Sequence, residues 1–272
     1  MDSFPMTAIG GEPISRMIAG SNWFRGYSHY SSAKDKWIRE YMTLELITEV
    51  LCVFACNGIN AYIAMPDDQT KEVLRRVKEE TGVTMHLIAT PSGEHIDDLL
   101  PGIEASAEAG ARFCLPHQHW TDGNLVANEQ RIIGIEQATR RIRELGMIPG
   151  LSTHRPETVV ICDKAGYDVE TYIQIYNAIG FLCQVETDWI ERVINNSPKP
   201  IICIKPLAGG RILPPTGLSF VYHSIKPIDT ICIGTLSVGE AEDDIRIARG
   251  LLAGSAVQAR ELQYSRSKKS LT

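Results

Sequence analysis

The sequence has no long apolar run, no basic region and no signal-peptide pattern, and each absence argues against a class of protein. Its apolar stretches fall short of the roughly 18 residues that a membrane span needs. The net charge of −6 offers no basic surface to nucleic acid, and the Lys/Arg cluster at residues 266–269 is typical of a frayed tail. The segment Met1–Pro5 lacks the basic and apolar parts of a signal peptide. We therefore expect a cytoplasmic protein that binds neither membrane nor nucleic acid.

The seven cysteines include no CxxC pair. Cys203 and Cys232 lie inside isoleucine-rich runs, where a thiol behaves as a small apolar side chain. An odd count with core placement argues against a disulfide framework or a zinc finger and for a reducing compartment. No linker or low-complexity segment divides the 272 residues, which suffice for one large core.

Short apolar segments alternate with amphipathic segments along the whole chain. The amphipathic segment 44–55 ends at Asn57-Gly58, a typical helix C-cap, and several others also end at glycine. Strands recur about every 30 residues, and eight such units close a (β/α)8 TIM barrel. We predict one α/β domain with this fold over residues 1–272, with an irregular tail from about residue 260. The predicted strands are Arg16–Gly20, Ala61–Met65, Thr84–Ala89, Ala111–Leu115, Ile148–Ser152, Thr171–Tyr176, Pro200–Ile204 and Asp229–Gly234. The predicted helices are Leu44–Ala55, Asp67–Glu80, Ile96–Ala109, Asn128–Leu145, Pro156–Ala165, Glu186–Asn196 and Val238–Leu252.

In such a barrel the active site lies at the carboxyl ends of the strands. Polar side chains follow the first strand in a long loop, and others follow the sixth strand. Arg25 could grip an anionic substrate, or it could only pack on Trp23. The predicted substrate-binding residues are Asn22, Arg25, His29, Gln174 and Asn177.

Two histidines, His117 and His119, stand two residues apart where the fourth strand is expected to end. In an extended chain such residues point to the same side. His154 ends the neighbouring strand, and Glu186 begins a later helix. Imidazoles and a carboxylate around one open position are typical of a catalytic metal site. We predict that His117, His119, His154 and Glu186 bind a divalent metal ion (Zn, Mn, Co or Fe). The alternative is that one histidine of the pair His117 and His119 is a hydrogen-bonded core residue while the other caps the loop, and that Glu186 is only a first-turn acid.

Lys205 follows the seventh strand and precedes Pro206. A lysine in this place could form a Schiff base or act as a positioned cation. We predict His119, Lys205 and Glu186 as catalytic residues. His223 has no assignable place in this scheme.

Several passages resemble the aldo/keto reductase superfamily, whose members are (β/α)8 barrels. The resemblance covers roughly the last 60% of the chain, with one short match in the first half. It implies the barrel fold and, in ordinary members, reduction of a carbonyl with a nicotinamide cofactor. The matching passages are His119–Asp122, similar to "HWPD", Gly150–Glu157, similar to "GxSxH", Ile204–Gly210, similar to "KPLAGG", Ile233–Glu240, similar to "GxxSxxE", and Gly58–Asn60, similar to "GIN".

The chain departs from this family at the positions that carry its reaction. Family reductases use Asp, Tyr, Lys and His, of which the Tyr protonates the carbonyl. The first three positions fall on Ile63, near Asp68, and on Thr90 or Pro91, so only the histidine survives, as His119. A missing tyrosine cannot donate a proton.

The nucleotide end of the site departs too. The family's stacking aromatic corresponds to Ile204, and acids at 240–244 stand where basic residues hold the 2′-phosphate of NADP. Such acids would repel a phosphate. Gly209, Gly210 and Gly234 could let the backbone approach an anion, or could simply be turn residues. An NAD(P) cofactor is therefore less expected than a metal ion.

Three functions remain open. The leading hypothesis is an isomerase or lyase that abstracts a proton beside the carbonyl of a small, sugar-like substrate with metal assistance. The alternatives are a divergent NAD(P)-dependent aldo/keto reductase and a catalytically inactive binding protein. A homo-oligomer is possible in each case.

Overall fold

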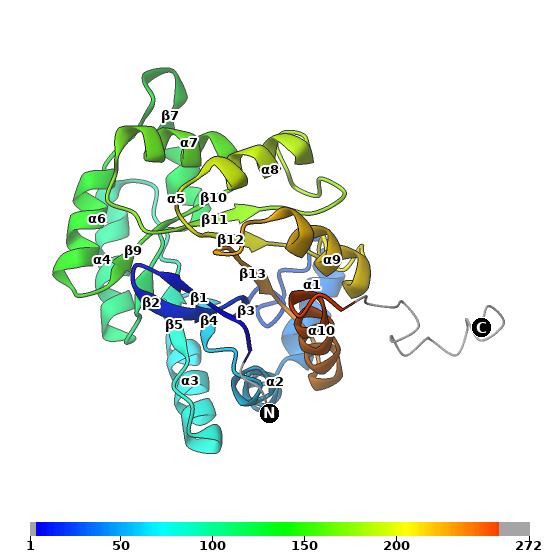
Figure 1. Cartoon of the computed structure of the whole chain (residues 1–272). Helices are drawn as coiled ribbons and strands as arrows, with labels where there is room; N and C mark the ends of the chain where they lie inside the picture. Colours follow the sequence, from blue (N-terminus) through cyan, green and yellow to red (C-terminus); the bar gives the residue numbers. More distant parts are fainter. Residues whose placement is uncertain (1–3, 256–272) are drawn as a thin grey trace.

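The computed structural model describes residues 4–255, so the predicted tail from residue 260 lies outside the described residues. Nine short parallel strands form one barrel (Figure 1). Two of them, β9 and β10, are the two halves of a single barrel strand that is interrupted at Gly150. The first half, β9, pairs with β6, and the second half, β10, pairs with β11. A Cβ at Gly150 would lie 2.7 Å from the Thr171 oxygen, so only glycine fits this joint. The barrel strands are β3 (Met17–Gly20), β4 (Ala61–Ala64), β5 (His86–Ala89), β6 (Phe113–Cys114), β9 (Ile148–Pro149), β10 (Leu151–Thr153), β11 (Tyr172–Ile175), β12 (Ile201–Ile204) and β13 (Thr230–Ile233).

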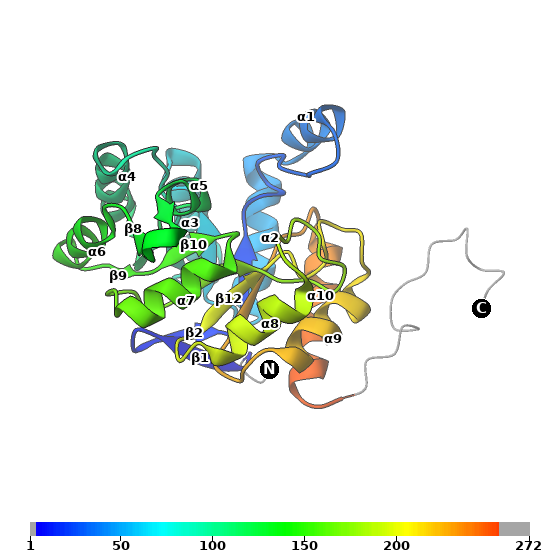
Figure 2. The same cartoon turned by 90° about the horizontal axis from the view of Figure 1, so that it is seen from above.

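The barrel interior is filled by apolar side chains from alternate strand positions, including Ile18, Phe113 and Ile202. An N-terminal hairpin of β1 (Met6–Ile9) and β2 (Glu12–Ser15) adds Ile9 and Ile14 to the same cluster. Figure 2 places this hairpin at one end of the barrel and helix α1 (Ser32–Tyr41) at the other. The hairpin therefore closes the amino end of the barrel, and the carboxyl ends of the strands open on the side of α1.

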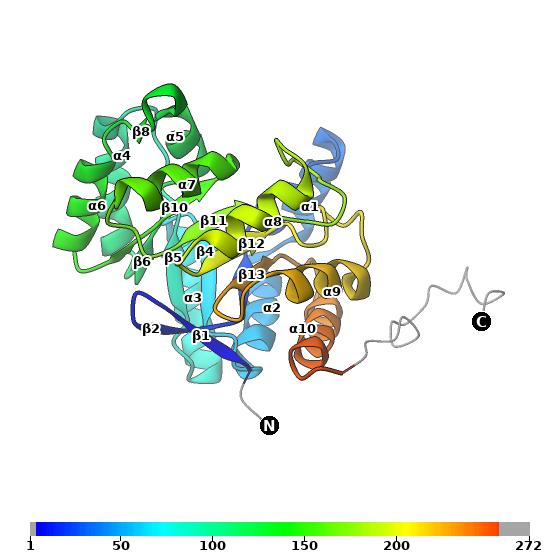
Figure 3. The same cartoon turned by 45° about the horizontal axis from the view of Figure 1, so that its top comes forward.

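Helices surround the barrel and bury a second, larger apolar layer against it. Each large aliphatic or aromatic side chain buried in this layer contributes about 1.5–3 kcal/mol. Side-chain caps fix several helix starts; Asp67, for example, accepts a hydrogen bond from the amide of Thr70 at 3.0 Å. Helices α9 and α10 pack side by side (Figure 3). The remaining helices are α2 (Leu44–Cys56), α3 (Asp68–Thr81), α4 (Ile96–Glu108), α5 (Gln118–Gly123), α6 (Ile135–Glu144), α7 (Pro156–Ala165), α8 (Thr187–Asn196), α9 (Pro214–Ser224) and α10 (Val238–Leu252).

The predicted (β/α)8 fold is confirmed, and each predicted strand overlaps a strand of the barrel. The predicted helix Asn128–Leu145 is wrong in its first part. A hairpin of β7 (Leu125–Val126) and β8 (Arg131–Ile132), joined through the 3-10 turn η1 (Ala127–Glu129), occupies that part, and α6 starts only after Gly134.

Three helices, α1, α5 and α9, were not predicted, and α9 contains His223 in its last turn. The cysteines are all free thiols. Among residues 4–255, no helix is both long and apolar enough to cross a membrane.

Candidate active site at the barrel mouth

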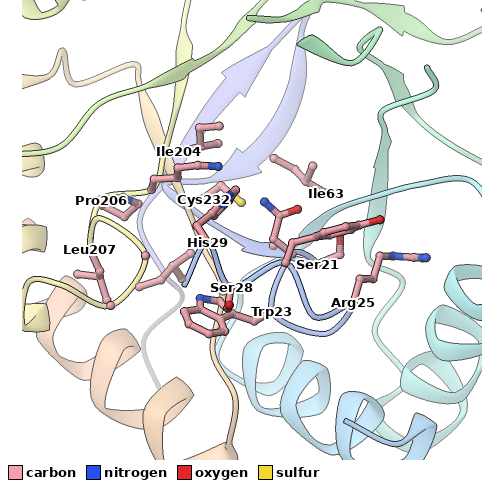
Figure 4. A pocket seen from close by; sticks show the side chains of 18 of the residues that line it. Ser21, Trp23, Arg25, Ser28, His29, Ile63, Ile204, Pro206, Leu207 and Cys232 are labelled. Atoms are coloured by element: carbon pink, nitrogen blue, oxygen red, sulfur yellow. The ribbon is translucent and has the colours of Figure 1, made fainter. Parts of the chain in front are cut away.

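One large cavity of about 920 Å³ lies at the carboxyl ends of the strands. Its floor is apolar and comes from the barrel itself, through Ile63, Ile204 and Cys232, while the loop after β3 covers it with Trp23 and His29 (Figure 4). From this floor the cavity continues along the loop after β12 to the first turns of α10. Its volume is near the upper end of the range of small-molecule sites, roughly 300–1,000 Å³.

His117 and His119 both line this cavity, but not from a strand. Strand β6 already ends at Cys114, and His117 is the N-cap of α5, with its Nδ1 accepting a hydrogen bond from the His119 amide at 3.3 Å. The expectation that the two side chains share one strand face is therefore wrong. His117 is half-buried, whereas His119 is exposed at the rim. Burial and the nearby His119 and Lys205 lower the pKa of His117.

His154 follows β10 and lies deeper in the cavity wall. Its backbone amide donates to Oδ2 of Asp122 at 3.0 Å, and the Thr153 hydroxyl donates to the other oxygen of that carboxylate. Burial, together with Lys205 and the other histidines of the cavity, lowers the pKa of His154 to about 3. The imidazole is therefore neutral at physiological pH and is available as a hydrogen-bond partner.

The predicted metal site is not assembled. Glu186 is the exposed N-cap of α8 and lies outside the cavity lining, because the loop after β11 carries it to the surface. Among residues 4–255, no three His, Cys, Asp or Glu side chains come together in a way that could hold a metal ion. The structure thus gathers the three histidines around one cavity without forming a ligand set, and Glu186 does not join the predicted catalytic group.

Lys205 lines the cavity directly after β12. Burial in the cavity wall lowers its pKa. Among the described residues no hydrogen bond or ion pair engages its ammonium group, and it lines the cavity beside the thiol of Cys232. His29, from the loop after β3, also faces this cation, and its pKa is lowered by burial and by Lys205.

The predicted substrate-binding residues divide into two groups. Asn22, Arg25 and His29 line the cavity, whereas Gln174 and Asn177 do not. Gln174 alternates with the inward-facing Ile173 and is fully buried outside the barrel interior. Asn177 is buried too, and its side chain bonds both backbone groups of Phe181. These two residues support the loop instead of contacting a ligand.

Arg25 lines the cavity but does not present its charge to it. Two hydrogen bonds of 2.6 and 2.8 Å tie its guanidinium to Asp67, the N-cap of α3. Figure 4 shows the side chain turned away from Ile204 and Cys232. The expectation that Arg25 grips an anion is not supported, because its charge is already compensated.

The positions of the family's missing tetrad are also located. Ile63 and Thr90 line the cavity, while Asp68 starts α3 with its side chain in solvent. Tyr27, in the loop after β3, lines the cavity and was overlooked in the sequence. Nothing in its spacing marks it, because the loop has no regular period.

The glycines that were expected to lie near a nucleotide, Gly209, Gly210 and Gly234, include two that make room for neighbouring side chains. A Cβ at Gly234 would lie 2.7 Å from the indole of Trp23, so this glycine makes room for Trp23. Gly209 and Gly210 have φ of 63° and 81°, which favours glycine, and a Cβ at Gly209 would press on Arg211 and Phe181. Of these residues, Trp23 and the three glycines line the same cavity.

Arg211 holds three loops of the mouth together, and sequence reasoning missed it. Its guanidinium lies 4.3 Å from the Tyr30 ring centre and 4.0 Å from that of Phe181. It also donates to the backbone oxygens of His29 and Ala208. The loops after β3, β11 and β12 thereby form one rim.

Asp244, in α10, has the most unusual surroundings at the far end of the cavity. Its side chain lines the cavity, the residue is only 3% exposed, and none of the described residues offers it a hydrogen bond or a salt bridge. Burial, with Glu240 and Asp243 nearby, raises its pKa well above the usual value. A carboxylate in such a place is costly unless a ligand supplies donors.

Comparison with known proteins supports the fold. No family model and no curated protein matches the chain. Among solved structures, a proposed aldo-keto reductase of Pseudomonas aeruginosa aligns with a TM-score of 0.69 at 15% identity, over 92% of this chain and 98% of that one. An aldose reductase of Giardia lamblia aligns with a TM-score of 0.53 at 8% identity, over 95% of each chain. A dihydrodipicolinate synthase also aligns, with a TM-score of 0.52 at 11% identity, over 80% of this chain and 73% of that one. The chain therefore has the aldo/keto reductase type of barrel, a fold shared with other chemistry.

Proposed function

We propose that this chain is a divergent carbonyl reductase of the aldo/keto reductase type, which reduces a small polar aldehyde or ketone with a nicotinamide cofactor. The observation that carries the proposal is the continuity of the cavity. A single volume of about 920 Å³ extends from Lys205 and His117 at the mouth to Glu240 and Asp244 in α10. That volume accommodates an elongated cofactor together with a small substrate.

The residues at the α10 end fit NAD(H) better than NADP(H). Asp244 is a buried carboxylate without a partner among residues 4–255, and the hydroxyl groups of a ribose are donors that would satisfy it. A 2′-phosphate would instead meet Glu240, Asp243 and Asp244, all of which line the cavity. Asp244 would therefore hold the adenosine ribose, and the acids would disfavour the phosphorylated cofactor.

The cofactor, when bound, supplies the hydride. The residues of the chain must then stabilise the negative charge that develops on the carbonyl oxygen and protonate it. Another residue must do this, because the family's tyrosine is missing. The Lys205 ammonium has no carboxylate partner in the described residues, so it can polarise the carbonyl and pass a proton from Nζ to the developing alkoxide. Its lowered pKa favours this transfer. In the neutral imidazole of His117, Nδ1 already accepts from the His119 amide, so Nε2–H can donate to an oxygen of the substrate. The neutral imidazole of His154 can accept a hydrogen bond from a substrate hydroxyl group.

This proposal replaces the metal-assisted isomerase or lyase as the leading interpretation, because the side chains expected to bind a metal ion do not converge. It does not rest on the aligned structures alone, whose low identity carries the fold only. The cytoplasmic location, the possible homo-oligomer and the lack of nucleic-acid binding remain predictions.

The test is a fluorescence titration of the full chain with NADH and with NADPH, followed by turnover of glyceraldehyde. We expect NADH to bind and NADPH to bind at least about tenfold more weakly. Lys205→Met should abolish turnover while leaving NADH binding intact, and Lys36→Met, on the exposed face of α1, should change neither. Absence of NADH binding at millimolar concentration would overturn the proposal.

A further inference from the structure

Lys205 has an uncommon backbone conformation for a residue with a side chain. Its φ is 61°, in the left-handed region, and it follows β12 directly. The turn is closed by a hydrogen bond of 2.8 Å from the amide of Ala208 to the Lys205 oxygen. Conformations of this kind are unfavourable for residues with a side chain and gather at functional sites. This backbone conformation sets the direction in which the lysine side chain leaves the main chain.

The surroundings of Lys205 differ from those of the other lysines that are largely shielded from solvent. Lys199 contacts Asp163 at 3.1 Å, and Lys226 contacts Asp229 at 3.0 Å. Around Lys205 the titratable neighbours are His29, His117, His154 and Cys232, and none of them is a carboxylate. No described residue therefore holds Lys205 in its charged form.

We propose that Lys205 is a covalent site, where its amine forms an imine with an uncharged hydroxyaldehyde or hydroxyketone that enters the barrel mouth. The inference rests on the proposed binding of a carbonyl at this mouth, but it requires no nicotinamide. The floor beside the lysine is apolar, through Ile63, Ile204 and Cys232. The cavity lining also includes hydroxyl and amide groups from Ser21, Asn22 and Ser152. Arg25, the other cation of the lining, is already paired with Asp67, so nothing here selects an anionic substrate.

The chemistry follows from the free amine. The lone pair of Nζ attacks the carbonyl carbon while the C=O π electrons move to oxygen, and a proton passes from nitrogen to oxygen to give a carbinolamine. The hydroxyl group then takes up one proton and leaves as water while the nitrogen lone pair forms the C=N bond, and the remaining N–H proton is released, so the proton taken up is returned. The balance is one amine and one carbonyl giving one imine and one water. Burial lowers the pKa of Lys205 and so raises the fraction of reactive amine. His117 and His154, both neutral, can relay the protons.

The experiment is reductive trapping on the full chain without added nicotinamide. Protein is incubated at pH 7 with D-glyceraldehyde or dihydroxyacetone, treated with sodium cyanoborohydride, and analysed by intact mass and peptide mapping. We expect one adduct per chain, located on Lys205, and roughly tenfold less labelling of every other lysine. Lys205→Arg, which keeps the charge but cannot form this imine, should lose the adduct. Lys199→Arg, at the paired lysine, should keep it.

Labelling spread evenly over surface lysines, or an unlabelled Lys205 peptide in the wild-type protein, would overturn the proposal. Because mapping is done on the wild-type chain, the result does not depend on the folding of a variant. A chain that is trapped at Lys205 but binds no NADH would overturn the reductase and leave the covalent site standing. If the chain binds NADH and reduces glyceraldehyde but is never trapped, the covalent site is overturned and the reductase stands.

Discussion

The carboxylate of Asp122 accepts the backbone amide hydrogen of His154 at 3.0 Å, so helix α5 fixes the end of β10. The same carboxylate accepts a hydrogen bond from the hydroxyl of Thr153. Two passages that resemble aldo/keto reductases, His119–Asp122 and Gly150–Glu157, are therefore joined in space. Asp122, the last residue of the first passage, positions the backbone that carries His154.

Removing this carboxylate should destabilise the protein. Asp122→Ala leaves the His154 amide without its acceptor and removes the shortest of the hydrogen bonds made by the Thr153 hydroxyl, which we expect to cost about 1–3 kcal/mol in urea unfolding. The control is Asp168→Ala, which removes exposed contacts to Arg143 and should cost less than about 1 kcal/mol. Equal losses in the two variants would contradict the positioning role.

Stability should fall below neutral pH through His154. Its pKa is about 3 in the folded chain, against about 6.5 when unfolded, so between these values the unfolded chain binds a proton that the folded chain does not. This contribution is therefore complete above pH 6.5 and is lost as pH falls toward 3. His117 and His29, with lowered pKa values, act in the same direction, whereas the raised pKa of Asp122 opposes them.

The measurement is the free energy of unfolding at pH 7.5 and pH 5. The difference between these values should shrink by about 2 kcal/mol in His154→Asn. His223→Asn, at an exposed position on α9, is the control and should leave the difference unchanged. An undiminished difference in His154→Asn would show that this imidazole is not held neutral by the fold.

The barrel could be predicted from sequence because its strands are buried on both faces. Ile201–Ile204 is therefore an uninterrupted apolar run, and Thr230–Ile233 is apolar after its first residue. Glycines mark the ends of several of the helices between such runs. The hairpin Met6–Ser15 has no such signature. Its Ile9 and Ile14 look unremarkable until the barrel end that they close is known.

The site could be predicted only as a set of loops. The period of two that placed His117 and His119 on one face applies to strands, and the chain leaves β6 before either residue. The partner of Arg25 could not be predicted either, because Asp67 lies 42 residues away in sequence. The positions of loop side chains depend on contacts between segments that are distant in sequence. Arg211 is an example, because its guanidinium packs on the rings of Tyr30 and Phe181.

Glu186 provides a direct test of the abandoned metal site. Because its side chain is exposed at the start of α8 and away from the cavity, Glu186→Gln should leave glyceraldehyde turnover within about twofold of wild type. Treatment with EDTA followed by dialysis should also leave turnover unchanged. Loss of activity on chelation, with recovery on adding Zn²⁺ or Mn²⁺, would revive the metal hypothesis, with ligands other than the predicted four.

Asp244 should be a position where stability and binding conflict. Its carboxylate is buried beside Glu240 and Asp243, which raises its pKa well above the usual range, so its ionised form is costly at neutral pH. Asp244→Asn removes the charge at constant size. We expect this variant to gain about 1–3 kcal/mol in the free energy of unfolding.

The same substitution should weaken binding of NADH roughly tenfold or more, because a neutral amide holds a ribose diol less strongly than a carboxylate. Asp243→Asn is the matched control: Asp243 lies in the same helix but contacts Arg246 at 2.8 Å, so its loss should not stabilise the chain. Urea unfolding and fluorescence titration give the two readouts independently. If Asp244→Asn is stabilised but its NADH affinity is unchanged, the buried carboxylate does destabilise the protein, and the ribose is held elsewhere. If the variant is not stabilised, hydrogen-bond donors already satisfy the carboxylate in the free protein.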